Sequence, residues 1–318
     1  MQAQRHSRRT ILAAGAAGAA AGLMHSARPA AGQAALASPA APKADGVSIP
    51  GKSTDLPVTL KVSIAGYSFR EFLDKPGKPG KMSLLDLADM AARWKIDAIE
   101  PTSYYFLRED DEFIYTLKRR VYLNGLEISG LPLGTNFCFP PGPELQKQLA
   151  EVRKWVDIGA KLGTPGMRIF AGRKDNRPRA EILKTMAPAL REACDYAGAH
   201  GIFLAIENHG FMTETADDVL RIVEAVRHDW LGVNLDTGNF SGDAYAEMAK
   251  IAPLAVSCQV KALASSGPGK RGPVDLARVV QILRQARYRG YVTLEYEEKD
   301  PHQVVPELLG RIQEAIRA

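Results

Sequence analysis

Short apolar segments alternate with amphipathic segments along most of the chain, from residue 59 to the C-terminus. The apolar segments are rich in Val, Ile and Leu, which is typical of strands buried on both faces. The amphipathic segments repeat their apolar residues at the three-to-four spacing of one helix face. The pattern predicts strands at residues 60–65, 98–100, 126–131, 166–170, 202–207, 231–236, 255–261 and 291–295.

A helix is predicted after each of these strands. Two of the helices begin with a capping box, in which side chains at the helix start bind free backbone N–H groups: Ser83 with Asp86, and Thr215 with Asp218. The predicted helices cover roughly residues 83–94, 110–123, 145–156, 178–199, 243–250, 274–287 and 303–316, with one more from residue 215 onward.

Strands separated by helices pair in parallel through right-handed crossovers. Eight such units in one chain predict an α/β fold with a single (β/α)8 TIM barrel, which we place at residues 58–318 as the catalytic domain. An open doubly wound sheet is the alternative. It usually carries a glycine-rich phosphate turn after the first strand, and residues 66–70 have no such pattern.

The N-terminal residues have the composition of an export signal. Residues 1–37 contain four arginines and no Lys, Asp or Glu, and an Ala/Gly-rich stretch ends near the small residues Ala35 and Ala37. Arg8 and Arg9 lie in a run that resembles a twin-arginine signal. We therefore expect residues 1–37 to be a twin-arginine signal peptide, residues 38–57 to be a flexible Pro/Ala-rich linker, and the protein to be periplasmic or otherwise exported by the twin-arginine machinery.

Charge and composition narrow the class of partner. The chain carries 41 Lys+Arg and 36 Asp+Glu, a formal net charge of +5. Without the four arginines of the predicted signal peptide, 41 − 4 = 37 basic residues face 36 acidic ones, which argues against nucleic acid as a partner. No apolar stretch is long enough for an integral membrane protein. Three scattered cysteines are too few for a disulfide framework.

Candidate chemistry lies where the last four strands end, which is where barrel active sites form. These strand ends carry Glu207, Asp236, Gln259 and Glu295. Three unpaired carboxylates at one point repel each other, so we expect raised pKa values or a divalent cation between them. An all-oxygen set favours Mn2+ or Mg2+ over Zn2+. Each acid taken alone is also compatible with a helix N-cap or an ion pair.

Four short motifs carry a resemblance to a known family: AIENH at residues 205–209, NLDTGN at 234–239, CQVK at 258–261 and LEY at 294–296. Together they resemble the xylose isomerase-like superfamily of sugar isomerases and epimerases, over about residues 60–317. The resemblance implies that Glu207, Asp236, Gln259 and Glu295 hold a divalent metal ion, Mn2+ first with Mg2+ or Co2+ as alternatives. It also implies that the two glutamates move protons.

Two positions depart from the family pattern. Many ketose epimerases have His where this chain has Gln259 and Asn239. His209 follows Glu207 closely and is a further candidate for general acid/base or ligand, or else a loop histidine bonded to backbone. Lys261 lies on the same side of its strand as Gln259 and is a candidate to stabilise an enolate or to form a buried salt bridge. Glu100, Arg168 and Tyr67 are weaker candidates for substrate contact.

These observations predict an exported, metal-dependent isomerase or epimerase that abstracts a proton next to a carbonyl of a carbohydrate or polyol. A keto-sugar or keto-glycoside lyase or dehydratase on the same metal site is an alternative, and a non-catalytic periplasmic carbohydrate-binding barrel is an alternative of another class. A DNA-repair endonuclease of the same superfamily would need more histidines than the four found after residue 37. A homo-oligomer is possible.

Overall fold

The computed structural model describes residues 49, 51–53, 55–174 and 176–318. The predicted signal peptide at residues 1–37 and most of the predicted linker lie outside the described residues. Within the described part, none of the helices combines the length and the apolar character needed to cross a bilayer.

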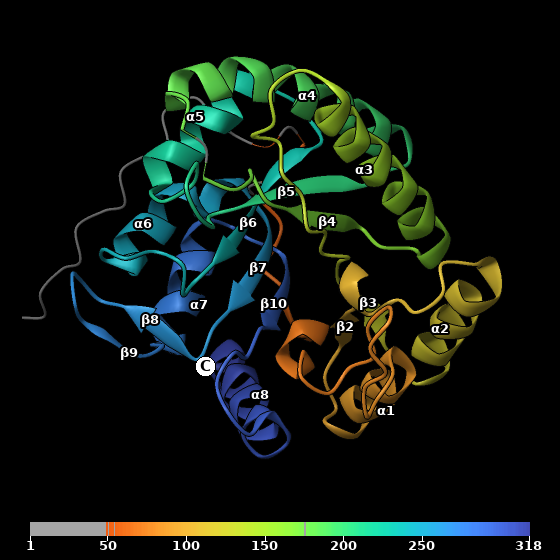
Figure 1. The fold of residues 1–318 in the computed structure, drawn as a ribbon. Coiled ribbons are helices and arrows are strands. Elements are labelled where there is room, and N and C mark those ends of the chain that lie inside the picture. The colour runs from red at the N-terminus through yellow and green to blue at the C-terminus, as the bar shows by residue number, and fades with distance from the viewer. Residues whose placement is uncertain (1–48, 50, 54, 175) are drawn as a thin grey trace, which may run out of the picture. The chain divides into compact units, whose positions relative to one another are not determined.

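The central element is an eight-stranded parallel sheet that curls into a TIM-barrel-like α/β fold (Figure 1). Its strands, in the order in which they pair, are β3 (Glu127–Ile128), β2 (Ala98–Glu100), β1 (Leu60–Ala65), β10 (Gly290–Leu294), β7 (Ala255–Val260), β6 (Leu231–Asp236), β5 (Phe203–Glu207) and β4 (Gly166–Ile169). Each matches a strand predicted from the sequence, so the parallel α/β architecture is confirmed.

The third strand is shorter than the predicted residues 126–131. Only Glu127 and Ile128 pair as a strand, with β2. The chain beyond them turns toward β4, because Leu131 N donates to Gly166 O (3.0 Å) and Leu133 N donates to Arg168 O (2.8 Å). These bonds connect the two edges of the curled sheet.

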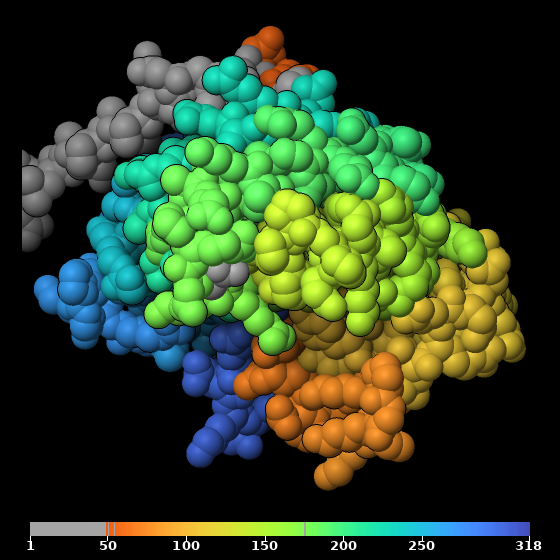
Figure 2. All heavy atoms as spheres, turned by 45° about the horizontal axis from the view of Figure 1, so that its top comes forward, coloured from red at the N-terminus to blue at the C-terminus, as the bar shows by residue number. Residues whose placement is uncertain are grey.

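The α-helices lie on the outer face of the sheet, and α3 and α4 pack side by side there (Figures 1 and 2). In the described residues they are α1 (Leu84–Arg93), α2 (Asp111–Leu123), α3 (Pro143–Leu162), α4 (Arg179–Ala199), α5 (Ala216–Val226), α6 (Ala244–Ile251), α7 (Leu276–Gln285) and α8 (Pro301–Arg317). Short 3-10 turns follow β1 (η1, Gly66–Phe69) and β2 (η2, Ser103–Tyr105) and precede β7 (η3, Ala252–Leu254). Both predicted capping boxes are present, at Ser83 and at Thr215.

A small hairpin between β7 and α7 was not predicted. Its strands, β8 (Leu263–Ser265) and β9 (Arg271–Pro273), have three residues each, too short for a hydrophobic period to be recognised in the sequence. The hairpin contacts the loop after β6, since Arg271 Nη1 donates to Gly238 O (2.9 Å). It therefore supports the C-terminal end of the barrel.

The inside of the barrel is unusually polar. In most TIM barrels bulky apolar residues fill the interior, whereas here polar side chains occupy alternate strand positions and are buried. The apolar residues between them, such as Val233, Leu235 and Cys258, lie in the core shared with the helices. The buried polar set includes Ser63, Glu100, Ser129, Arg168, Glu207, Asn234, Asp236, Gln259, Lys261, Thr293 and Glu295.

The described residues between positions 49 and 57, which we call the strap, contact the opposite end of the barrel. Arg289, just before β10, donates to the carbonyls of Ser53 (2.9 Å), Leu56 and Pro57 (2.9 Å). Lys52 Nζ donates to Pro253 O, just before β7 (2.9 Å). The strap thus lies where the strands begin, away from the predicted site.

Candidate active site

The C-terminal end of the barrel gathers three predicted carboxylates around one ammonium. Glu207 ends β5, Asp236 ends β6, Glu295 follows β10 and Lys261 follows β7; all four are at least 95% buried. Lys261 Nζ forms ion pairs with Asp236 Oδ2 (3.5 Å), with Glu295 and with Glu297 Oε1 (2.8 Å). The structure therefore brings Glu207, Asp236 and Glu295 to the same end of the barrel as Lys261.

Lys261 is held as a cation. Burial alone lowers the pKa of a lysine, but the carboxylates of Asp236, Glu295 and Glu207 outweigh burial and raise the pKa of Lys261 well above its usual value. The side chain is therefore an ammonium at neutral pH, at the centre of a negatively charged group.

Both oxygens of Glu207 face a donor group, although Oε2 and Arg168 Nε form an ion pair without a hydrogen bond. Arg168 Nε lies 2.9 Å from Oε2, and Asn239 Nδ2 donates to Oε1 (2.9 Å). Burial raises the pKa of Glu207 to about 7, with Arg168 opposing the rise and Glu295 adding to it. Asn239, where many ketose epimerases have histidine, thus serves here as a hydrogen-bond donor to the predicted proton-transfer residue.

Asp236 is fixed by backbone contacts on one side and by Lys261 on the other. Gly238 N donates to Oδ1 (2.7 Å), while Asn208 accepts from Asp236 N (2.8 Å) and donates to its carbonyl (2.9 Å). Burial raises the pKa of Asp236 to about 7, against the effect of Lys261. Its Oδ2 atom is buried without a hydrogen bond and has the Lys261 ion pair at 3.5 Å.

Gln259 belongs to a different group of contacts. Its Oε1 accepts from Asn234 Nδ2 (2.8 Å) and its Nε2 donates to Glu100 Oε2 (2.7 Å). Asn234 Oδ1 in turn accepts from Ser257 Oγ (2.7 Å). A chain of hydrogen bonds therefore runs across the barrel interior through the amide of Gln259. Burial raises the pKa of Glu100, at the end of this chain, to about 7.

His209 faces a large cavity and lies outside the carboxylate cluster. Its ring is tilted over that of Phe170, with the ring centroids 4.6 Å apart, and the Arg168 guanidinium lies 4.0 Å from the Phe170 ring centroid. The cavity has a volume of about 1290 Å3, and its lining includes Tyr104, Asn136, Phe139, Phe170, Arg173 and His209. Burial and the charge of Arg168 lower the pKa of His209, which favours the neutral imidazole.

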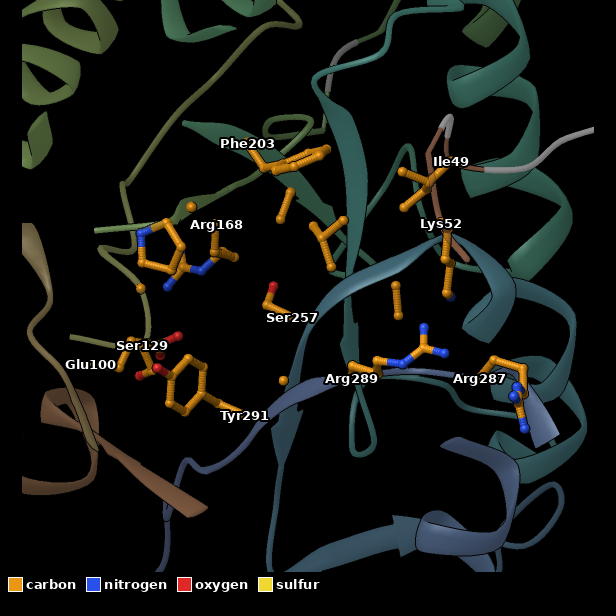
Figure 3. A pocket seen from close by; sticks show the side chains of 17 residues that line it. Ile49, Lys52, Glu100, Ser129, Arg168, Phe203, Ser257, Arg287, Arg289 and Tyr291 are labelled. Atoms are coloured by element: carbon orange, nitrogen blue, oxygen red, sulfur yellow. The ribbon is translucent and has the colours of Figure 1, made fainter. Parts of the chain in front are cut away.

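The three weaker candidates divide between the two ends of the barrel. Tyr67 lies in η1, just after β1. Burial raises the pKa of Tyr67, and the nearby charge of Glu297 raises it further, so Tyr67 is close to the Lys261 cluster. Glu100 and Arg168 line a second cavity of about 290 Å3 that opens toward the strap (Figure 3). Arg168 thus lines this cavity and also pairs with Glu207 at the carboxyl ends of the strands.

The second cavity is mainly apolar with a basic rim. Figure 3 shows Glu100, Ser129 and Tyr291 grouped on one side and Lys52, Arg287 and Arg289 on the other. Its lining also includes the small residues Gly130, Gly166, Ala205, Ala255 and Gly290. Because these residues leave the barrel interior only partly filled, the structure is hollow below the carboxylate cluster.

The arrangement of the four predicted metal ligands does not fit a divalent ion. The carboxylates of Glu207, Asp236 and Glu295 already face Arg168 or Lys261, and both ends of the Gln259 amide are bonded within the protein. Among the residues that the structure describes, no group of three or more His, Cys, Asp and Glu side chains is placed to hold a metal ion.

Sequence reasoning missed several contacts of the site. Glu297 had a usable signal, because it lies two residues after Glu295 in an acidic run, but it was not singled out. Asn208 directly follows β5 and Asn234 lies within β6, and the partners of both lie on neighbouring strands. Nothing local in the sequence indicates which amide will bond to which partner.

The fold and the carboxylate-rich strand ends define a TIM-barrel protein with a charged site at the carboxyl ends of its strands. Residues 88–316 match the family model described as xylose isomerase-like TIM barrel, and the chain belongs to this family. A search of curated proteins finds no match.

Solved structures of the same fold include proteins of both reaction classes. The 3-keto-D-glucoside 4-epimerase from E. coli, in its apo form, is 15% identical with a TM-score of 0.63, over 81% of this chain and 99% of that chain. The probable 3-DHS dehydratase involved in petrobactin synthesis from Bacillus anthracis is 16% identical with a TM-score of 0.62, over 81% and 99%. A xylose isomerase-like TIM barrel protein from Mycobacterium smegmatis, in complex with magnesium, is 19% identical with a TM-score of 0.63, over 80% and 96%.

Proposed function

We propose that this protein is an exported enzyme that transfers a proton at a carbon next to a carbonyl of a carbohydrate or polyol, as an isomerase or epimerase. The observation that carries the proposal is the pairing of Asp236 and Glu295 with the Lys261 ammonium, beside Glu207 with its Arg168 partner, at the end of the barrel where TIM-barrel active sites lie. Carboxylates for proton transfer and a cation for a developing oxyanion are the parts that such chemistry needs.

The metal ion expected from the sequence takes no part in the proposed steps, because its donor groups are engaged with side-chain cations and amides. A substrate carbonyl oxygen instead binds the Lys261 ammonium in place of Glu297, whose side chain is 41% exposed. Glu207 or Glu295, or His209 from the large cavity, removes the proton from the adjacent carbon. The C–H electron pair forms a C=C bond and the C=O pair moves to oxygen, so the enediolate charge lies against Lys261.

The same intermediate has two outcomes. Return of the proton to the other face or to the neighbouring carbon gives an epimer or an isomer. Loss of an oxygen substituent from the next carbon gives elimination, the reaction of a keto-sugar or keto-glycoside lyase or dehydratase. The occurrence of an epimerase and a dehydratase among proteins of this fold supports keeping both outcomes.

One observation favours the non-catalytic alternative, a carbohydrate-binding barrel. The carboxylates and Lys261 are almost inaccessible, whereas the large cavity beside them is lined by the aromatic side chains of Tyr104, Phe139 and Phe170. Aromatic rings beside polar groups are suited to bind sugars without reaction.

Hydrogen exchange into substrate distinguishes these functions. The protein is incubated in D2O with a panel of keto-sugars and keto-glycosides, and deuterium incorporation and products are followed by NMR and mass spectrometry. We expect deuterium at the carbon next to the carbonyl, with an isomerised product or with release of water or an aglycone. Binding of a sugar without any exchange or product would favour the non-catalytic barrel.

Replacement of the proton-transfer carboxylate provides the control. Glu207→Gln should lower the exchange rate by about 10²–10⁴-fold, which is the usual contribution of a general acid or base. Glu192→Gln removes a surface carboxylate that pairs with Arg153, and should leave the rate unchanged. Equal rates in Glu207→Gln and the unaltered protein would assign the proton transfer to another group.

Export is the part of the proposal that rests on the sequence alone. Replacement of Arg8 and Arg9 by lysine should leave the full-length precursor in the cytoplasm, because the twin-arginine pathway reads the arginine pair. Cell fractionation with an antibody against the barrel measures this. Unchanged delivery to the periplasm would indicate another route.

A further inference from the structure

We propose that Lys261 is the resident cation of the carboxylate cluster, so that the folded protein binds no divalent ion there, and that Gln259 is a structural amide and not a ligand. This inference concerns the site of the proposed function. Its test counts bound metal, however, and can fail or succeed independently of any catalytic assay.

The first step is the position of the ammonium. Lys261 Nζ contacts Asp236, which ends β6, and Glu295 and Glu297, which both follow β10. A divalent ion bound by Asp236 and Glu295 would have to share their oxygens with this ammonium at very short range. Like charges at that distance repel strongly in a buried site, so the ammonium and the ion compete for one position.

The lysine is fixed in this position by its surroundings. A Cβ atom on Gly238 would lie 2.5 Å from Lys261 Cγ and 2.8 Å from its Cβ, so the backbone after β6 packs directly on the lysine stem. Lys261 N also donates to Thr237 Oγ1 (2.9 Å), and Arg271 of the hairpin holds the carbonyl of Gly238. The side chain is therefore packed into the cluster and has little freedom to withdraw from it.

The remaining predicted carboxylate ligand, Glu207, also faces a side-chain cation, Arg168. Arg168 lies against Glu207 Oε2 and its Nη1 donates to Leu133 O (2.8 Å), so the guanidinium is held between the glutamate and the backbone. Asn239 occupies the other oxygen of Glu207 with an N–H donor. Asn239, where many ketose epimerases have histidine, thus directs an N–H group to the carboxylate.

The carbonyl oxygen of Gln259 is not available to a metal ion unless buried hydrogen bonds are broken. Ser257 donates to Asn234, which directs the Asn234 amide N–H to Gln259 Oε1 and leaves Gln259 Nε2 for Glu100. Turning the Gln259 carbonyl toward a metal would break this chain and leave buried polar groups of Asn234 and Glu100 without partners. The amide is matched to its neighbours and not to an ion.

The test begins with the metal content of the full chain, purified without a histidine tag, treated with EDTA and desalted. Metals are counted by mass spectrometry after exposure to Mn2+, and free Mn2+ is followed by electron paramagnetic resonance during titration. We expect far less than one ion per chain and no saturable Mn2+ binding. A single EDTA-removable ion per chain, or saturable binding that Asp236→Asn abolishes, would overturn the proposal.

Variants test the reason for this result. Lys261→Met removes the ammonium and should raise the Mn2+ affinity at least about tenfold, because three carboxylates then lack their common cation. Lys261→Arg keeps the charge and should show no gain. Lys250→Met is the matched control, since Lys250 pairs with Asp217 and Glu247 away from the site, and it should also show no gain. Equal Mn2+ binding in Lys261→Met and Lys250→Met would contradict the proposal.

Gln259→His separates a structural amide from a ligand. If Gln259 were a ligand, an imidazole in its place would strengthen Mn2+ binding while Lys261 is still present. On our proposal the variant binds no more Mn2+ than the unaltered chain, and its urea midpoint falls because the bonds to Asn234 and Glu100 are lost. Circular dichroism of every variant verifies that the barrel is folded when metal is measured.

Discussion

Two lysines at opposite ends of the barrel, the half-buried Lys52 and the buried Lys261, have pKa values shifted in opposite directions. At the strap end, burial and then the neighbouring charge of Arg289 lower the pKa of Lys52 to about 8. At the carboxylate end, the pKa of Lys261 is raised above its usual value although that side chain is more deeply buried. The difference lies in their partners: Lys52 donates to a backbone carbonyl, and Lys261 faces three carboxylates.

The comparison distinguishes two uses of buried charge. At the strap end, cationic side chains bind neutral carbonyls and hold the chain across the strand starts. At the carboxylate end, charges pair with one another in a site of low dielectric constant, where a substrate oxygen can compete for them. The first end is therefore expected to govern stability and the second to govern binding and chemistry.

The largest expected effect on stability comes from Arg168, which lines the smaller cavity toward the strap and pairs with Glu207 at the carboxylate end. Arg168→Met should lower the free energy of unfolding by about 3–5 kcal/mol, because it leaves the buried carboxylate of Glu207 without its cation. Urea denaturation measures the loss. The double variant Arg168→Met/Glu207→Gln should recover a large part of it, since the uncompensated charge is then gone.

The matched surface control is Arg120→Met. Arg120 pairs with Asp89 at 3.4 Å with both side chains partly exposed, so its removal should cost less than about 1 kcal/mol. Similar losses for Arg168→Met and Arg120→Met would mean that the buried pair contributes no more than a surface pair.

The strap end supplies the next largest effect. Arg289→Ala removes the donor for the carbonyls of Ser53, Leu56 and Pro57, and should lower the free energy of unfolding by about 2–3 kcal/mol. Amide hydrogen exchange should accelerate in the strap and not around Asp236. Accelerated exchange at both ends would show that the two regions are not separate in stability.

Much of the fold could be predicted because it depends on local periodicity. The strand ends at Glu207, Asp236 and Glu295 follow from apolar runs whose limits are visible in the sequence, and parallel pairing then brings these ends together. The same reasoning overextended β3, because the chain leaves β2 after Ser129, whose N–H still donates to Ile99 O, and then bonds to β4 through its backbone. Apolar residues continue past that point, so the pattern carries no sign of the change.

The contacts inside the barrel could not be predicted in the same way. Gln259 bonds to Glu100, which is 159 residues away in the chain, and strand alternation gives the facing direction of each but not their pairing. The sequence placed Lys261 on the side of Gln259 and left open a salt bridge or an enolate contact. Its shared position among Asp236, Glu295 and Glu297 depends on the packing of Gly238, a tertiary effect.

Gly238→Ala tests that packing at the carboxylate end. The added methyl group meets the stem of Lys261 at less than van der Waals distance, so the lysine or the backbone must move. We expect a loss of about 1–2 kcal/mol in the free energy of unfolding, as for overpacked cores. The rate of deuterium exchange into substrate should also fall, because the ammonium is displaced from the carboxylates. A normal exchange rate would show that the position of Lys261 is not critical.

A glycine-to-alanine substitution at the strap end should have a small stabilising effect. Gly166 begins β4 and lines the smaller cavity, its φ is not positive, and an added Cβ would lie 3.4 Å from Phe203 O, in ordinary contact. Gly166→Ala should therefore raise the free energy of unfolding by about 0.4–1 kcal/mol, because the unfolded chain loses conformational freedom. Urea midpoints measure the change in stability, and rates of deuterium exchange into substrate measure the effect on the reaction. If Gly166→Ala slowed exchange as much as Gly238→Ala does, the smaller cavity would have to be part of the reacting site, and the division of the barrel into a stabilising end and a chemical end would fail.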